Sequence, residues 1–239
     1  MKEYYVFVGS FGSGKSELAI NFALNKAQEN PPCTLLDMDV INPYFRSSER
    51  MDILKKADVR LISPPFAMNK IEIMSLSPEV YSSFAQKEGT VIFDAGGDPV
   101  GAISLGQYYS NFCNIPSEQL HVFMVINPLR PLAETAEKAL GLMEQIQVAS
   151  RLKITGFINN ANLVEETTTQ ELKTGYDVVK ELSEKTGIPV YATAGTEKIL
   201  NDFFSQKEIW NLEEKYTGRM MPISVVMHRT WNKFLKEGL

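Results

Sequence analysis

The chain has 239 residues, a net charge of -5 and only two cysteines, Cys33 and Cys113. The acidic balance argues against a dedicated nucleic-acid-binding protein, because such proteins are normally basic. Without a C-x-x-C pair, the cysteines predict neither a zinc ribbon nor a redox dithiol, and we expect two buried thiols. The length and a hydrophobic content of 44% suit a single globular domain over residues 1–239.

Short apolar runs alternate with helix-length segments along the chain. The predicted strands are Tyr4–Val8, Thr34–Asp37, Val59–Ile62, Thr90–Asp94, His121–Asn127, Ile154–Asn159 and Pro189–Ala192. The predicted helices follow Lys15 and cover Ser47–Ala57, Pro78–Gln86, Gly101–Phe112, Pro131–Ala149, Thr168–Thr186, Thr196–Phe204 and Ile223–Lys236. This alternation predicts an α/β fold with a doubly wound, mostly parallel sheet and helices on both faces. The functional loops should then follow the C-terminal ends of the strands.

The loop after the first predicted strand matches the phosphate-binding pattern G-x-x-x-x-G-K-S/T at every fixed position. Its residues are Gly9, Ser10, Phe11, Gly12, Ser13, Gly14, Lys15 and Ser16, with Glu17 opening the next helix. Backbone N–H groups and a helix N-terminus placed in this way bind phosphates. Lys15 would reach the β- and γ-phosphates, and the Ser16 hydroxyl would ligate Mg²⁺. The segment therefore predicts a P-loop that binds a nucleoside triphosphate with Mg²⁺.

Acidic residues follow two of the apolar runs. Asp37 and Asp39 end the second predicted strand, and their spacing places both on one side of it. The run Thr90–Asp94 ends in an acid followed by Gly96 and Gly97. This is a Walker B pattern, in which Asp94 would help to hold Mg²⁺ and Gly97 would bring its backbone near the γ-phosphate.

The segments GSFGSGKS, LLDMD, VIFDAGG, VINP and GFINN together resemble the MinD/ParA/CobQ/CobB group of SIMIBI-class P-loop proteins, over about residues 4 to 200. The resemblance implies ATP (or ADP) and Mg²⁺ as cofactors, with Lys15 and Asp39 as catalytic residues. It implies that Asp39 orients the attacking water and belongs, with Ser16 and Asp94, to the Mg²⁺ site. It also implies that Val40–Arg46 and Ala95–Val100 act as the two switch segments.

In this group an asparagine at a later strand end hydrogen-bonds the base, which makes Asn159 or Asn160 the candidate here. The residues alone leave open which of the two does so. The guanine-reading motif N-K-x-D is absent from the sequence, which favours ATP over GTP.

The chain departs from the MinD/ParA branch at Ser10, where that branch has a signature lysine used across a homodimer. Arg46, Arg50 and Arg130 are candidates to replace its charge. Homodimerisation is thus left open. The last segment, about 220–239, is expected to be helical and to pack on the core, although MinD-type proteins attach to membranes by such a tail.

The leading hypothesis from the sequence is a Mg²⁺-dependent ATPase that switches its contact with a protein partner. One alternative is an ATP-dependent small-molecule enzyme of the cobyrinate amidase or dethiobiotin synthetase type, with a pocket lined by Tyr44–Asn69, Tyr108 and Tyr109. Another is a non-catalytic nucleotide-binding regulator. No signal peptide precedes the P-loop and no apolar run is long enough to cross a bilayer, so we expect a cytoplasmic protein that is not bound to membranes.

Overall fold

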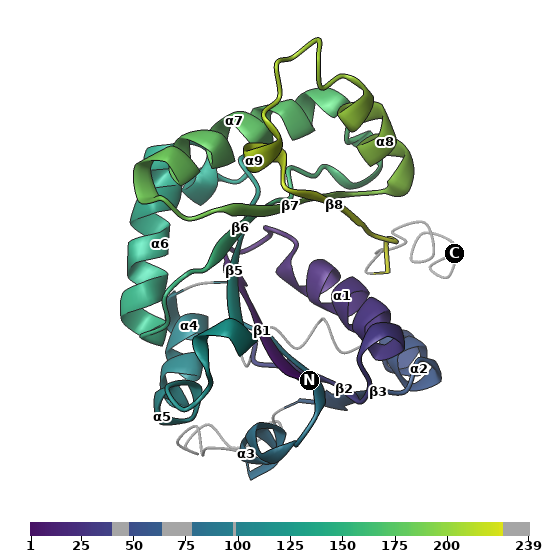
Figure 1. Ribbon diagram of the computed structural model, residues 1–239, viewed down its shortest axis with the longest axis vertical. Helices are drawn as coiled ribbons and strands as arrows, with labels where there is room; N and C mark the ends of the chain where they lie inside the picture. The colour runs from purple at the N-terminus through teal and green to yellow at the C-terminus, as the bar shows by residue number, and fades with distance from the viewer. Residues whose placement is uncertain (40–47, 64–77, 98, 227–239) are drawn as a thin grey trace, which may run out of the picture.

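The computed structural model describes residues 1–39, 48–63, 78–97 and 99–226. Its centre is an eight-stranded sheet in the order β3-β2-β4-β1-β5-β6-β7-β8, and every neighbouring pair of strands is parallel (Figure 1). The strands are β1 Lys2–Gly9, β2 Cys33–Asp37, β3 Val59–Ile62, β4 Gly89–Asp94, β5 Leu120–Ile126, β6 Gly156–Asn159, β7 Val190–Gly195 and β8 Arg219–Pro222. The strand order reverses direction at β1, which confirms the predicted doubly wound sheet.

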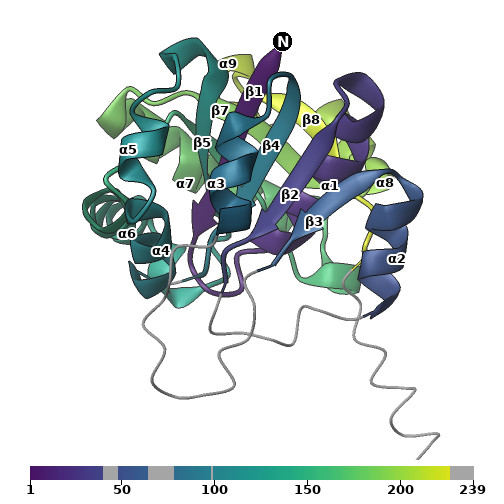
Figure 2. The ribbon, with the colours of Figure 1, turned by 90° about the horizontal axis from the view of Figure 1, so that it is seen from below.

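Helices cover both faces of the sheet. They are α1 Lys15–Glu29, α2 Ser48–Lys56, α3 Pro78–Ala85, α4 Pro99–Gly106, α5 Tyr109–Phe112, α6 Ala136–Ser150, α7 Thr169–Thr186, α8 Glu197–Ser205 and α9 Glu214–Thr217. Figure 2 shows α1 and α2 on one side of the strands and α3, α4, α5 and α6 on the other. Right-handed crossovers between parallel strands require this two-sided arrangement. It places the loops that follow the strands along one edge of the sheet.

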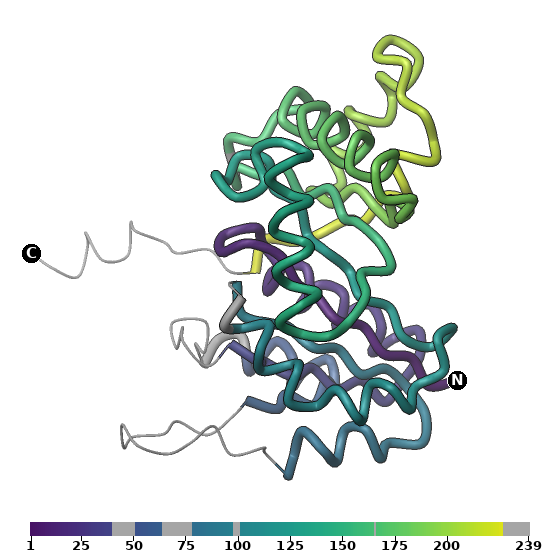
Figure 3. The backbone as a smooth tube through the Cα atoms, turned by 90° about the vertical axis from the view of Figure 1, so that its left-hand side faces the viewer, coloured from purple at the N-terminus to yellow at the C-terminus, as the bar shows by residue number. Residues whose placement is uncertain are grey.

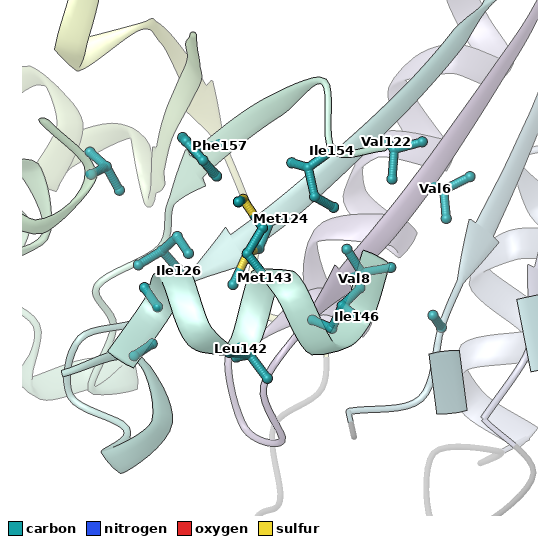
Figure 4. Packing of buried hydrophobic residues seen from close by; sticks show 14 of the residues in the cluster. Val6, Val8, Val122, Met124, Ile126, Leu142, Met143, Ile146, Ile154 and Phe157 are labelled. Atoms are coloured by element: carbon teal, nitrogen blue, oxygen red, sulfur yellow. The ribbon is translucent and has the colours of Figure 1, made fainter. Parts of the chain in front are cut away.

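The sequence of β1 explains the two buried layers. Tyr4, Val6 and Val8 point into one apolar cluster, while Tyr5 and Phe7 point into the other. A strand buried on both faces is therefore apolar at every buried position, as β1 is from Tyr4 to Val8. Figure 4 shows the first cluster, where Leu142, Met143 and Ile146 of α6 pack over β1 and β5. Burying each side chain of this size contributes about 1.5 to 3 kcal/mol.

Residues 219–222 correct the prediction for the C-terminal segment. The chain forms β8 there, pairing Thr193 with Met220 and Gly195 with Pro222, so the predicted helical segment does not begin at residue 220. Proline fits because β8 is the last strand of the described sheet and needs no partner on its outer side. Residues 223–226, the start of the predicted helix Ile223–Lys236, are not helical, and residues 227–239 lie outside the described part of the chain. No helix among the described residues is long and apolar enough to cross a membrane.

The predicted helix Gly101–Phe112 is two helices. It breaks after Gly106, where the backbone packs so closely on α6 that an added Cβ would lie 2.6 Å from the carbonyl oxygen of Ala149. Cys33 is buried as predicted, whereas Cys113 is exposed at the end of α5. The prediction of two buried thiols is therefore wrong for Cys113, because the second of these short helices ends at the surface.

Candidate functional site

The phosphate-binding loop lies between β1 and α1, and its shape depends on glycine. Gly9, Gly12 and Gly14 have φ values of 147°, 72° and 89°, which other residues adopt only at a cost in strain. Lys15 is 6% exposed, and its Nζ donates a hydrogen bond of 3.0 Å to the carbonyl oxygen of Ser10. The loop thus curls around the lysine that the sequence predicts to bind phosphate.

Three loops meet around one cavity of about 190 Å³ at the C-terminal edge of the sheet. They follow β1, β2 and β4, which are neighbours in the sheet. The cavity is lined by Phe11, Gly12, Gly14, Lys15, Ser16, Glu17, Asp39 and Gly97. A larger hollow of about 900 Å³ lies against β2, β3 and α3, and none of the predicted nucleotide- or metal-binding residues lines it. We therefore place the site at the smaller cavity, where the predicted chemistry converges.

Asp94 lies beneath this cavity with its carboxylate almost fully buried, 7% exposed. The Ser16 hydroxyl hydrogen-bonds the carboxylate, and within the described chain its Oδ1 atom has no hydrogen-bond partner. Burial raises the pKa of Asp94 to about 7; Lys15 and Ser16 act to lower it, and Asp37 and Asp39 raise it further. A buried carboxylate with a spare oxygen beside a hydroxyl is suited to a cation.

The described residues contain no group of three or more His, Cys, Asp or Glu side chains that could hold a metal by themselves. A Mg²⁺ site of the P-loop kind does not require such a group. Such sites use one or two carboxylates and complete the coordination with phosphate oxygens and water. Ser16 and Asp94 fit this donor set, and Asp39 lies on the same cavity.

The loop after β4 approaches the phosphate-binding loop at a distance that excludes side chains. A Cβ on Gly97 would lie 2.7 Å from the Cα of Phe11 and 3.1 Å from Nζ of Lys15. A Cβ on Gly96 would lie 2.9 Å from the Cα of Gly101, a contact that the sequence analysis missed. The sequence signal for this close contact was the presence of glycine at positions 96, 97 and 101, on either side of Pro99. Residues 40–46, the first predicted switch segment, lie outside the described part of the chain.

Asn159 and Asn160, the two predicted base-reading residues, have different surroundings. Asn159 is fully buried, donates to the carbonyl oxygen of Leu172 at 3.0 Å and accepts from the Ala161 N–H at 3.2 Å. It therefore holds α7 against β6. Asn160 donates to the carbonyl oxygen of Ser13 at 2.7 Å and braces the phosphate-binding loop. Neither side chain lines the 190 Å³ cavity.

Arg130 contacts the phosphate-binding loop from the loop after β5. Its Nε donates to the carbonyl oxygen of Gly12 at 3.1 Å, although the side chain is otherwise exposed. Asn127 shapes this loop by accepting from the Leu129 N–H at 3.1 Å and donating to the Asn162 carbonyl at 3.2 Å. Of the three arginines proposed to replace the missing lysine, Arg130 therefore contacts the phosphate-binding loop. Arg46 lies outside the described residues.

Several solved structures share this architecture. The cell division protein FtsY of Thermotoga maritima aligns with a TM-score of 0.53 and 17% identity, over 83% of this chain and 63% of that one. FtsY of Mycoplasma mycoides aligns with a TM-score of 0.54 and 14% identity, over 88% and 67%. A nucleotide-binding protein of Archaeoglobus fulgidus in complex with ADP aligns at 0.50 and 15%, over 90% of both chains. The chain shares the parallel α/β fold of these structures.

At these identities the likeness is one of fold, and the P-loop NTPase fold is what it establishes. The chain spans about three fifths of the length of the Thermotoga FtsY. No protein-family model matches the sequence. No curated protein matches it either.

Proposed function

We propose that the chain is a Mg²⁺-dependent ATPase that binds ATP at the phosphate-binding loop, hydrolyses it to ADP and phosphate, and changes its contact with a protein partner. The observation that carries the proposal is the convergence of Lys15, Ser16, Asp39 and Gly97 on one cavity, above the buried Asp94. The fold is also that of the Archaeoglobus protein, whose structure contains ADP.

The residues of the cavity divide the work of binding a triphosphate. Lys15 neutralises phosphate charge, while the N–H groups of the loop and the N-terminus of α1 donate hydrogen bonds to the phosphate oxygens. Ser16 and Asp94 would hold Mg²⁺, which neutralises phosphate charge when bound. Asp39 accepts a hydrogen bond from the water that attacks the γ-phosphate and so orients it. Gly97 brings a backbone N–H to the γ-phosphate side.

ATP is proposed over GTP because the sequence lacks the N-K-x-D motif. The alternative of a small-molecule enzyme required a pocket lined by Tyr44–Asn69, Tyr108 and Tyr109. Described residues of the first stretch, among them Met51, Lys55 and Ser63, line the 900 Å³ hollow, which none of the predicted nucleotide-binding residues reaches. Tyr108 is 4% exposed and packs edge-on against Tyr81 and face-on against Phe84, so it belongs to the core. Tyr109 is exposed on α5. The switch ATPase is therefore the function that the described residues support best.

Phosphate release from Mg²⁺·ATP by the full chain tests this proposal, with Asp39→Asn as the matched variant. Asparagine keeps the size of Asp39 and removes its charge, so we expect ATP binding to persist while turnover falls by at least a hundredfold. Solution mass with and without nucleotide, measured on the same variant, reports homodimerisation. Turnover equal to the wild type in Asp39→Asn would refute the role given to Asp39, and a variant that no longer binds ATP would make Asp39 a binding residue.

A further inference from the structure

The chain that follows β8 is held against the first turns of α1 by hydrogen bonds across 203 residues of sequence. Asn21 Oδ1 accepts from the Ser224 N–H at 2.8 Å, and Asn21 Nδ2 donates to the Ser224 carbonyl at 2.9 Å. Nearer to the phosphate-binding loop, the Val226 N–H donates to Glu17 Oε1 at 2.5 Å. We call Glu17, Asn21, Ser224 and Val226 the tail clamp. Figure 3 shows the chain after β8 and the loop that joins β1 to α1 at the same edge of the molecule, on the left of the view.

Asn21 is an unusual residue at this position of α1. It is 7% exposed, and a buried amide inside a helix is unfavourable unless its hydrogen bonds are satisfied. It pairs with both backbone groups of Ser224, as a residue of a neighbouring strand would. Its Nδ2 also lies 2.9 Å from the Glu17 carbonyl oxygen and 3.3 Å from Glu17 Oε1. Asn21 therefore fixes the chain after β8 and the side chain of Glu17 together.

Glu17 connects the clamp to the nucleotide cavity. It follows Ser16 directly and lines the same cavity. A carboxylate beside bound phosphates weakens their binding by charge repulsion, which is strong in a partly buried site. In the clamp, the Glu17 carboxylate faces the Val226 N–H and the Asn21 amide. Breaking the clamp would free this charge to turn toward the phosphates.

The clamped segment also borders another hollow, of about 570 Å³. Ile223 and Val225 line it together with Asn162 after β6 and Thr196 after β7. The segment that Asn21 holds therefore contacts both α1 and the hollow formed by the loops after β6 and β7.

We propose that Asn21 is a positioning residue that acts through Glu17 to couple nucleotide binding with the docking of residues 223–226 on α1. The proposal rests on the proposed function, because it requires nucleotide in the cavity. With the clamp closed, the Glu17 charge is held away from the phosphates, so nucleotide binding favours the closed clamp. By linkage, the closed clamp strengthens nucleotide binding by the same factor.

The test uses Asn21→Leu, which keeps the branched shape of the side chain and its number of heavy atoms and removes every clamp bond made by the amide. The matched control is Asn30→Leu at the other end of α1, where the Asn30 amide donates to the Met1 carbonyl at 2.9 Å and to Thr90 Oγ1 at 3.3 Å. Calorimetry measures Mg²⁺·ADP affinity, and hydrogen exchange of the Ser224 and Val226 amides is followed with and without Mg²⁺·ADP. We expect ADP to slow exchange in the wild type.

Asn21→Leu should bind Mg²⁺·ADP at least fivefold more weakly and lose this ADP-dependent slowing, while Asn30→Leu keeps both. Adding Glu17→Gln to Asn21→Leu should restore affinity, because it removes the charge that the open clamp releases. The rescue is judged against Glu17→Gln alone, because a merely structural asparagine would weaken binding by the same factor in that background as in the wild type. If Asn21→Leu does not fold, Val226→Pro removes the N–H that Glu17 accepts and leaves α1 unchanged, with the same expected weakening.

Wild-type affinity and unchanged ADP-dependent exchange in Asn21→Leu would overturn the coupling while leaving the proposed function intact. In Val226→Pro, where only the Ser224 amide can be followed, wild-type affinity and unchanged exchange of that amide would do the same. Weak binding without rescue by Glu17→Gln would overturn the charge argument. A wild-type chain that does not bind Mg²⁺·ADP would instead refute the proposed function, and the coupling with it.

Discussion

Gly14→Ala tests the geometry of the phosphate-binding loop most sharply. Gly14 has φ 89°, and a Cβ there would lie 2.3 Å from Nδ2 of Asn160. A left-handed alanine costs about 1 to 2 kcal/mol. The displaced Asn160 amide would also leave the Ser13 carbonyl without its 2.7 Å hydrogen bond, which costs about 1 to 3 kcal/mol in a buried site. Together these effects predict a loss of about 2 to 5 kcal/mol in the free energy of unfolding.

Gly187→Ala is the matched control. Gly187 ends α7 with φ 71°, but no atom lies within 4 Å of an added Cβ, so this variant carries the backbone strain alone. Denaturant unfolding and Mg²⁺·ADP titration should both be measured. Gly14→Ala should be the less stable variant and should bind ADP at least tenfold more weakly, whereas Gly187→Ala should bind like the wild type. Equal stability of the two variants, or unchanged ADP affinity in Gly14→Ala, would refute the close contact between Gly14 and Asn160.

Three further outcomes follow from the site. Arg130→Ala should lower turnover at least tenfold in a phosphate-release assay. Its free energy of unfolding should fall by less than about 1 kcal/mol, because the Arg130 side chain is exposed. Unchanged turnover would exclude Arg130 as the substitute for the missing lysine. Gly97→Ala should overpack against Phe11 and cost about 1 to 3 kcal/mol in unfolding, with weaker nucleotide binding, and wild-type values for both would contradict that contact. The metal-free chain should lose stability as pH rises from about 4 toward 7, because the pKa of Asp94 is about 7 in the folded state and about 3.9 in the unfolded state. Asp94→Asn should flatten this decline. If the free energy of unfolding falls with pH equally steeply in the wild type and in Asp94→Asn, the decline does not come from Asp94.

The predicted strands were found because a parallel strand buried on both faces is a continuous apolar run. All seven predicted strands are present, with ends displaced by a few residues. The phosphate-binding loop was readable for a similar reason, since the backbone can take that shape only with glycine at fixed positions. In both cases the residues of the segment itself are enough to determine its structure.

β8 was missed because its cause is not local. Arg219, Met220 and Pro222 are exposed and resemble a turn, and only pairing with β7 makes them a strand. The choice between Asn159 and Asn160 was unreadable for the same reason. Gly175 of α7 packs so closely on Asn159 that an added Cβ would lie 2.0 Å from Asn159 Oδ1. No pattern in the neighbouring sequence predicts that contact.

The central claim, that the cavity at Lys15 binds a nucleotide with Mg²⁺, is tested most directly by calorimetric titration of Mg²⁺·ATP and Mg²⁺·GTP into the wild type and Lys15→Ala. We predict that one ATP binds per wild-type chain, more tightly than GTP. We also predict that Lys15→Ala, which loses the cation inside the loop, binds ATP at least a hundredfold more weakly. No binding of either nucleotide to the wild type, or equal ATP affinity in Lys15→Ala, would contradict the assignment of the site.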